Sequence, residues 1–122
     1  MIKDIAFTGY PCADVTATRD WYEKNLGLKF AGAYGENGKE QYNESHLGST
    51  AFALVTHEWM ERKPGTGVGV AFEVEDLEKL IKDLRANGIT VSDAYETPVC
   101  KMSTLDDPEG NKVTLHQSTV PH

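Results

Sequence analysis

The sequence of 122 residues has only two cysteines, Cys12 and Cys100, which lie far apart in the chain. No CxxC pair occurs, so neither a disulfide framework nor a thiolate metal cluster is expected. The sequence also lacks a run of about 20 apolar residues, the length that a transmembrane helix needs. No apolar signal-peptide segment follows the N-terminus, and we therefore expect a cytoplasmic protein.

An excess of positive charge is missing as well. Twelve Lys and Arg residues stand against 19 Asp and Glu residues, which gives a net charge of −7. Proteins that bind nucleic acids or anionic membranes present basic surfaces, so neither is an expected partner. Hydrophobic residues make up 39% of the chain, which is typical of a globular domain of this length.

Two segments carry the signals of α-helices. The clearer one begins at Asp76, a good N-cap residue, and ends near Gly88. Its apolar residues recur on one helical face, at Leu77, Leu80, Ile81 and Leu84. The other segment covers Thr16–Asn25, with a cap at Asp14 or Thr16 and an end at Gly27. The same signals thus occur once in each half of the chain, which indicates an internal repeat.

Segments with the composition of β-strands surround each predicted helix. In the first half they are Ile2–Tyr10, Leu28–Tyr34, Gln41–His46 and Thr50–Thr56, with a type I′ turn at Asn37-Gly38. In the second half they are Val68–Val74, Thr90–Ser92, Cys100–Asp106 and Lys112–His116, with a turn at Asp107–Gly110. We predict an α+β fold in which two βαβββ modules form a curved mixed sheet. Residues 1–122 would be a single domain of two half-units, about 1–62 and 67–122, with a linker around 63–66.

Alternation along these strands predicts which side chains point away from the helices. In the segment 68–74, Val70 and Phe72 alternate with smaller or polar residues. The side away from the helices then carries Ala51, Ala53, Gly69, Ala71, Glu73, Thr114 and His116. A curved sheet with such a lining leaves room for a ligand or for a second subunit.

Three stretches carry a resemblance to a known family: Arg19–Leu28, Val70–Leu77 and Asp107–Val113. Together with the repeated βαβββ pattern, they resemble the vicinal oxygen chelate superfamily. This group includes glyoxalase I, extradiol dioxygenases, fosfomycin-resistance proteins and bleomycin-resistance proteins. The resemblance covers nearly the whole chain and implies the fold, but one fold serves many reactions.

The resemblance also implies where a metal would bind. Enzymes of this superfamily hold a divalent metal with His and Glu side chains from the first and last strands of each unit. Carried over to this sequence, these positions fall on Phe7, Ala53, Gly69 and Thr114. Three of these residues have no side-chain lone pair, and a neutral Thr hydroxyl is a weak ligand. We therefore expect no metal cofactor at the usual site.

Metal-free members of the superfamily bind a drug in a pocket that a second subunit helps to form. By this resemblance we predict a homodimer that binds a small organic molecule, with Glu73 and His116 as polar anchors. The predicted wall consists of Phe7, Ala51, Ala53, Gly69, Ala71 and Thr114.

Two alternatives stay open. A glyoxalase-like lyase or isomerase, or a dioxygenase, would use a displaced metal site around His116 and Glu73, completed by Glu40 or Glu44. An interaction module would use the same face without a ligand. The sequence decides neither whether a reaction is catalysed nor which ligand binds. We expect Cys100 to be a buried thiol.

Overall fold

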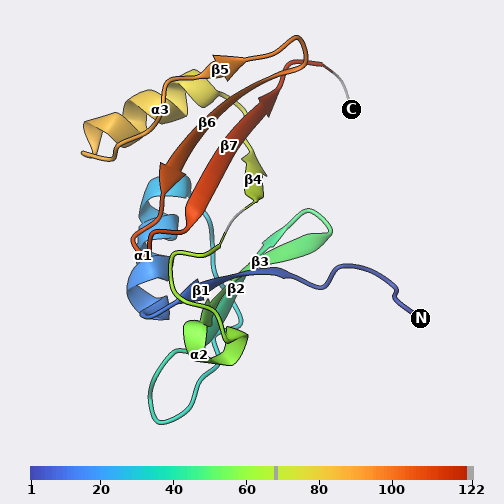
Figure 1. The fold of residues 1–122 in the computed structure, drawn as a ribbon, viewed down its shortest axis with the longest axis vertical. Helices are drawn as coiled ribbons and strands as arrows, with labels where there is room; N and C mark the ends of the chain where they lie inside the picture. Colours follow the sequence, from blue (N-terminus) through green and yellow to red (C-terminus); the bar gives the residue numbers. More distant parts are fainter. Residues whose placement is uncertain (68, 121–122) are drawn as a thin grey trace. The chain divides into compact units, whose positions relative to one another are not determined.

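The computed structural model describes residues 1–67 and 69–120 (Figure 1). They form two units, of which the first holds residues 1–67 and 107–111 and the second holds residues 69–106 and 112–120. The first contains a three-stranded sheet and the second a four-stranded sheet, and each sheet has both parallel and antiparallel pairs. The predicted α+β fold class is confirmed. None of the helices in the described residues is long and apolar enough to cross a membrane.

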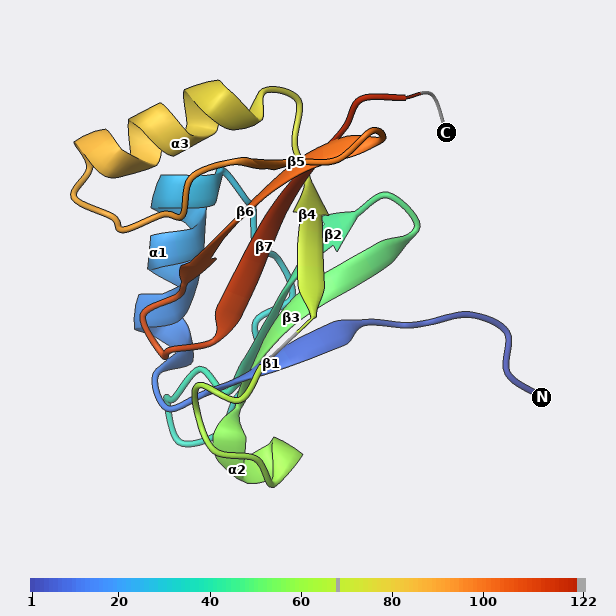
Figure 2. The same cartoon turned by 45° about the horizontal axis from the view of Figure 1, so that its top comes forward.

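The sheet of the first unit has the order β1-β3-β2 (Figure 2). β1 (Thr8–Cys12) runs parallel to β3 (Thr50–Thr56), and β2 (Tyr42–Leu47) runs antiparallel to it. A one-turn helix, α2 (His57–Met60), follows β3.

The helix of the first unit, α1 (Val15–Leu26), packs on one face of this sheet. The ring of Tyr22 lies 5.2 Å from that of Phe52. Asp14 caps the start by accepting a hydrogen bond from Ala17 N, and Gly27 ends the helix with a φ of 69°. Both ends agree with the sequence signals, because an N-cap oxygen and a left-handed glycine satisfy backbone groups that a helix end leaves open.

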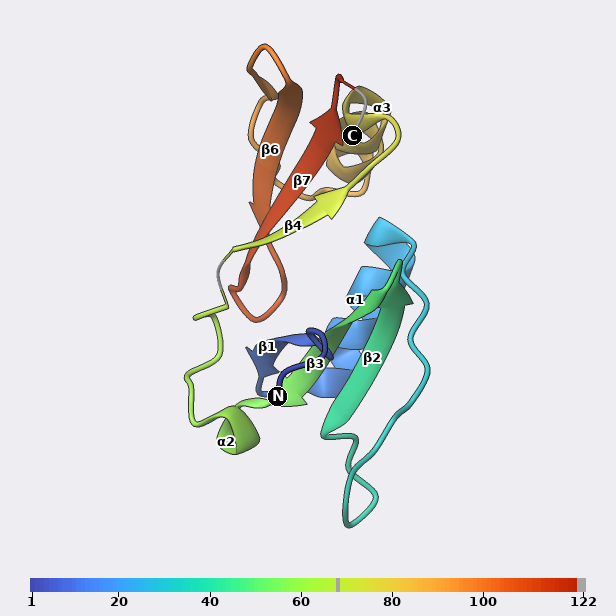
Figure 3. The same ribbon diagram turned by 90° about the vertical axis from the view of Figure 1, so that its right-hand side faces the viewer.

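The sheet of the second unit has the order β4-β7-β6-β5, and Figure 3 labels its strands β4, β7 and β6. Its strands are β4 (Val70–Glu73), β5 (Tyr95–Glu96), β6 (Cys100–Asp106) and β7 (Lys112–Ser118).

The helix of the second unit, α3 (Leu77–Ala86), is capped by Asp76 as predicted. It buries Leu77, Ile81 and Leu84. Val113 and Leu115 of β7 are fully buried in the same unit. Apolar residues recur every three or four positions in the helix and every two positions in the strand. This spacing produces the two buried faces.

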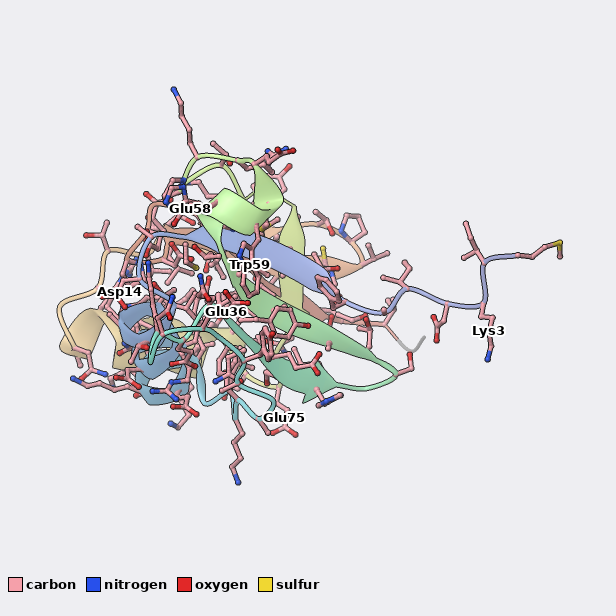
Figure 4. All side chains as sticks on the ribbon, turned by 90° about the horizontal axis from the view of Figure 1, so that it is seen from below. Lys3, Asp14, Glu36, Glu58, Trp59 and Glu75 are labelled. Atoms are coloured by element: carbon pink, nitrogen blue, oxygen red, sulfur yellow. The ribbon has the colours of Figure 1, made fainter. Side chains whose placement is uncertain are left out.

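Three predicted strands are wrong in part or in full. The strand predicted at Ile2–Tyr10 starts only at Thr8, and Ile2 and Ile5 are exposed. β3 begins at Thr50 and Thr8 pairs with Phe52, so the chain before Thr8 has little neighbouring strand with which to pair. In Figure 4 the segment with Lys3 runs away from the strands of its unit.

The other two corrections concern Leu28–Tyr34 and Thr90–Ser92. In the first, Tyr34 forms an isolated bridge to Tyr42, and the φ of 107° at Gly32 departs from extended strand backbone. The second forms no strand, and the short strand β5 comes later, at Tyr95–Glu96. The prediction for Val68 falls outside the described residues.

Both predicted turns are confirmed. Asn37 and Gly38 have φ values of 57° and 73°, and Lys39 N donates to Glu36 O at 3.0 Å. Two consecutive positive φ angles are the mark of a type I′ turn. In the other turn, Gly110 N donates to Asp107 O at 3.0 Å.

The turn at 107–111 also carries a buried polar network that belongs to the first unit. Asp107 Oδ2 accepts hydrogen bonds from the hydroxyl of Tyr22 and from Asn111 Nδ2. Asn111 Nδ2 also donates to Pro11 O, and Asn111 Oδ1 accepts from Gly67 N. Burial raises the pKa of Asp107 above its usual value, although these hydrogen bonds act in the opposite direction. The network joins parts of the unit that lie far apart in sequence.

Candidate functional site

One face of the second sheet collects four of the predicted site residues. In the register of β4 and β7, Ala71 pairs with Thr114 and Glu73 pairs with His116. Cross-strand partners place their side chains on the same face. Ala71 and Glu73 are exposed, and Thr114 and His116 are half-buried. Gly69 precedes β4 and is exposed. We call Ala71, Glu73, Thr114 and His116, with Met102 added below, the β4–β7 face.

Glu73 and His116 are in direct contact on this face. A hydrogen bond of 2.6 Å joins Nδ1 of His116 to Oε1 of Glu73. The other carboxylate oxygen, Oε2, accepts a hydrogen bond of 2.7 Å from Ser118 N. The side chain of His116 is 26% exposed and that of Glu73 is 55% exposed. The pair is therefore ordered by the protein and still accessible to a ligand.

The backbone around this pair is held by the end of β7. Val74 N donates to His116 O at 2.8 Å, directly after Glu73. Leu77 N, at the start of α3, donates to Gln117 Oε1 at 2.8 Å. The connection from β4 to α3 is thus anchored at two points after Glu73, and a rigid support of this kind positions a side chain better than a free loop.

Met102 is a neighbour that the sequence analysis did not assign. It lies on β6 directly opposite His116 in the register of β6 and β7. Its thioether side chain is half-buried. A signal for it was present in the sequence, since Met102 and Thr104 alternate with Ser103 and Leu105, but the register that brings Met102 to His116 depends on the turn between the strands.

The remaining predicted wall residues belong to the first unit. Ala51 and Ala53 are buried, 3% and 0% exposed. Phe7 is half-exposed, and its ring meets that of Tyr42 edge-on at 5.6 Å. The predicted site residues are therefore divided between the two units. The first unit holds Phe7, Ala51 and Ala53. The second unit holds Gly69, Ala71, Glu73, Thr114 and His116.

Exposed aromatic rings are also present in the first unit. Trp59, on α2 and labelled in Figure 4, lies 6.0 Å from the ring of Tyr34. The two residues are 46% and 60% exposed.

The two glutamates proposed to complete a displaced metal site have partners in the first unit. Glu40 accepts hydrogen bonds from Thr16 and Asn43 and lies 3.7 Å from a guanidinium nitrogen of Arg19. Glu44 accepts a hydrogen bond of 3.2 Å from the hydroxyl of Tyr42. Burial, and then the charge of Glu44, raise the pKa of Tyr42.

The four positions at which the superfamily's enzymes hold a metal do not fit a divalent cation. Phe7, Ala53 and Gly69 have no donor atom in the side chain, and Thr114 has a neutral hydroxyl. Within residues 1–67 and 69–120, no group of three or more His, Cys, Asp or Glu side chains is placed to hold a metal.

Both cysteines are buried, and neither forms a disulfide. Burial, with smaller effects of the Glu109 and Asp107 charges, raises the pKa of the Cys12 thiol to about 12. Cys100 is 6% exposed, as predicted for a buried thiol, and its sulfur lies 3.1 Å from Thr97 Oγ1. A buried thiol with a raised pKa, such as that of Cys12, is a poor nucleophile.

A surface hollow of about 370 Å³ occurs elsewhere in the second unit. It is lined by Glu78, Ile81, Lys82, Arg85, Asp93 and Ala94. None of the predicted site residues lines it. Arg85 is held there by hydrogen bonds to Val91 O and Asp93 Oδ1.

The chain belongs to the Glyoxalase/Bleomycin resistance protein/Dioxygenase superfamily, because residues 4–115 match the family's model. This result confirms the resemblance found in the sequence. No curated protein matches the chain.

Solved structures with the same fold include proteins of different kinds. The chain is similar to TnmS3, an antibiotic binding protein from Streptomyces sp. CB03234, with 20% identity, a TM-score of 0.82, and coverage of 97% of this chain and 98% of that chain. A member of the superfamily from Sphaerobacter thermophilus gives 22% identity, a TM-score of 0.81, and coverage of 95% and 98%. Lactoylglutathione lyase from Agrobacterium tumefaciens gives 17% identity, a TM-score of 0.76, and coverage of 96% and 95%. At these identities the likeness establishes the fold alone.

Proposed function

We propose that this protein binds a small organic molecule and uses no metal ion at the superfamily's usual site. The observation that carries this proposal is the donor set at the four usual positions. Phe7, Ala53 and Gly69 offer carbon or hydrogen where a metal needs nitrogen or oxygen, and Thr114 offers a weak neutral oxygen.

The β4–β7 face supplies the polar anchors of the proposed site. Binding sites for small molecules combine mostly apolar walls with a few positioned polar groups. Glu73 and His116 are such groups, since they are hydrogen-bonded to each other and partly exposed. Within the second unit, the wall beside these anchors would consist of Gly69, Ala71 and Thr114.

The similarity to an antibiotic binding protein supports this proposal at the level of the fold. The similarity to a lactoylglutathione lyase means that the same fold also serves an enzyme, so the site must decide between the two functions. We further propose that the protein acts in the cytoplasm as a homodimer, in which a second subunit completes the site. Sedimentation equilibrium tests the dimer, and a monomer at all concentrations would contradict it.

Metal analysis of protein purified without chelator tests the metal-free part of the proposal. We expect a metal content well below one ion per chain, unchanged in His116→Ala. One equivalent of metal that is lost in His116→Ala would instead support the alternative, a metal-dependent enzyme with a displaced site at Glu73 and His116. The 2.6 Å contact of these two side chains is the observation that favours this alternative.

Thermal unfolding in the presence of aromatic and peptide-like antibiotics tests ligand binding. A compound that binds only the folded state raises Tm, by an amount that grows with its concentration. We expect at least one compound to do so for the wild-type protein and to have a smaller effect on His116→Ala. If no compound raises Tm, the proposal fails and a module that only contacts other proteins becomes the better explanation.

A further inference from the structure

The hydrogen bonds around Glu73 determine which nitrogen of His116 carries a proton. Oε2 of Glu73 accepts from Ser118 N, which can only donate. In its carboxylate form, Glu73 is an acceptor at both oxygens. Because Oε1 lies 2.6 Å from Nδ1 of His116, Nδ1 must be the donor of that bond.

A neutral imidazole has one N–H and one lone pair, so a proton on Nδ1 leaves the lone pair on Nε2. In the described residues, Nδ1 is the ring nitrogen of His116 for which a hydrogen bond is recorded. The side chain of His116 is 26% exposed, so part of it can be reached by a ligand. In this state Nε2 accepts a hydrogen bond and cannot donate one.

The surroundings of the ring favour an aromatic partner. Met102 is directly opposite His116 in the sheet, and Ala71 is exposed on the same face. A methionine sulfur beside an aromatic ring gives a favourable contact. A flat ligand lying on Met102 and Ala71 would lie beside the ring of His116.

We infer that the ligand of this site is an aromatic molecule with an O–H or N–H donor, which hydrogen-bonds to Nε2 of His116. Glu73 is a positioning residue, since it holds the proton on Nδ1 and so keeps Nε2 an acceptor. This inference depends on the proposed ligand-binding function. It adds that the ligand is aromatic and carries a hydrogen-bond donor.

The tautomer can be measured without any ligand, by long-range ¹H–¹⁵N NMR of the histidine rings at about pH 8, where neutral imidazole prevails in general. We expect the Nδ1–H tautomer for His116. In Glu73→Gln, the side chain keeps its size, but its amide can turn the NH₂ group toward Nδ1, and we expect the Nε2–H tautomer to increase. A predominant Nε2–H tautomer in the wild-type protein would overturn the inference.

His46 is a matched control within the same chain. Its ring nitrogen Nε2 lies 3.7 Å from Glu44 Oε1, too far for a hydrogen bond, and the side chain is 72% exposed. We expect His46 to lack the strong preference for Nδ1–H, and Glu73→Gln to leave its signals unchanged. If His46 and His116 show the same tautomer ratio, Glu73 has no positioning role.

Two probes, 2-naphthol and its methyl ether, test whether the site accepts a hydrogen bond from its ligand. They differ in one hydrogen-bond donor. We expect the wild-type protein to bind 2-naphthol about tenfold more tightly, the effect of one hydrogen bond worth about 1.4 kcal/mol. In His116→Phe the two affinities should agree within about twofold, because the ring remains and the acceptor is lost. His46→Phe should retain the wild-type ratio.

Failure of the inference and failure of the proposed function give different results. If the antibiotic panel raises Tm but 2-naphthol shows no advantage over its ether, or neither probe binds, the inference is wrong and the binding function stands. If nothing in the panel raises Tm and neither probe binds, both are wrong.

Discussion

The hydroxyl of Tyr22 in α1 donates a hydrogen bond of 2.8 Å to Oδ2 of Asp107, in the turn at 107–111. Tyr22 is 0% exposed and Asp107 is 5% exposed. The bond joins residues that are 85 positions apart in sequence. Since a buried carboxylate is costly without partners, this contact is a main determinant of how the turn is held in the first unit.

Tyr22→Phe should destabilise the protein by about 2 kcal/mol, because the variant keeps the ring packing on Phe52 and removes one donor to a buried charged group. Urea unfolding followed by circular dichroism measures the change. Tyr95→Phe is the control, since Tyr95 is 66% exposed, and should be neutral within about 0.5 kcal/mol. Equal stability of the two variants would show that the bond to Asp107 contributes nothing.

Asp107 should also give the protein a specific dependence of stability on pH. Burial raises its pKa in the folded state above the usual 3.8, so the folded protein binds the proton more tightly than the unfolded chain does. The stability that this group contributes is therefore full below pH 3.8 and is lost as the pH rises through the raised folded pKa.

Asp107→Asn lacks this titration and should be less stable than the wild type, because its NH₂ group meets the donor Asn111 Nδ2. The stability difference between the two proteins should be larger at about pH 3 than at about pH 7. Urea unfolding over this pH range measures it. A difference that stays constant, or that grows with rising pH, would contradict the assigned direction.

The local signals in the sequence predicted both longer helices correctly. The helices begin after Asp14 and Asp76, and they end at or just before Gly27 and Gly88. These residues act through contacts within a few positions of the chain, so their effect can be predicted without knowing the tertiary structure. Strands depend on a partner. The Ile2–Phe7 segment has strand composition, yet it forms no strand in the unit, because β3 starts too late to pair with it.

The candidate site was predicted in its composition but not in its geometry. Alternation placed Glu73 and His116 on one face of the sheet, and the structure agrees. Their 2.6 Å contact and the donor at Ser118 depend on the register and on side-chain rotamers, which alternation does not determine. The network at Asp107 was missed entirely, because the residues 107–110 have a sufficient local explanation as a turn.

Gly67→Ala should be more destabilising than an ordinary glycine replacement. A Cβ at Gly67 would lie 2.5 Å from the ring of Tyr10 and 2.9 Å from Asn111 Oδ1, both buried. We expect a loss of about 3 kcal/mol in the free energy of unfolding, since neither neighbour has room to move.

Gly48→Ala is the matched control for this replacement. Its φ of 59° makes alanine unfavourable by about 1 kcal/mol, but the structure records no atom within 4 Å of the new Cβ apart from its chain neighbours. If Gly67→Ala costs no more than Gly48→Ala, the close approach of Gly67 to Tyr10 is not a constraint on the fold.

The two thiols should resist modification in the folded protein. Cys12 is 0% exposed with a pKa raised to about 12, and Cys100 is 6% exposed, so burial keeps reagents from both sulfur atoms. Labelling with a disulfide reagent should be slow in buffer and complete for both residues in guanidinium chloride. Rapid labelling of Cys100 under native conditions would revive a functional role for its thiol.

Filling the β4–β7 face should block the ligand without unfolding the protein. Ala71 is exposed on this face beside Thr114, so Phe at this position has space in the free protein but occupies the volume in which we place the ligand. We expect Ala71→Phe to lower the affinity for a panel compound by about tenfold or more while the free energy of unfolding changes by less than about 1 kcal/mol. Calorimetric titration measures the affinity, and urea unfolding measures the free energy of unfolding.

Ala86→Phe is the control, since Ala86 is an exposed residue at the end of α3, and this replacement should change neither quantity. Unchanged affinity in Ala71→Phe would mean that the ligand binds elsewhere, and the surface hollow beside Arg85 would then be the next site to test.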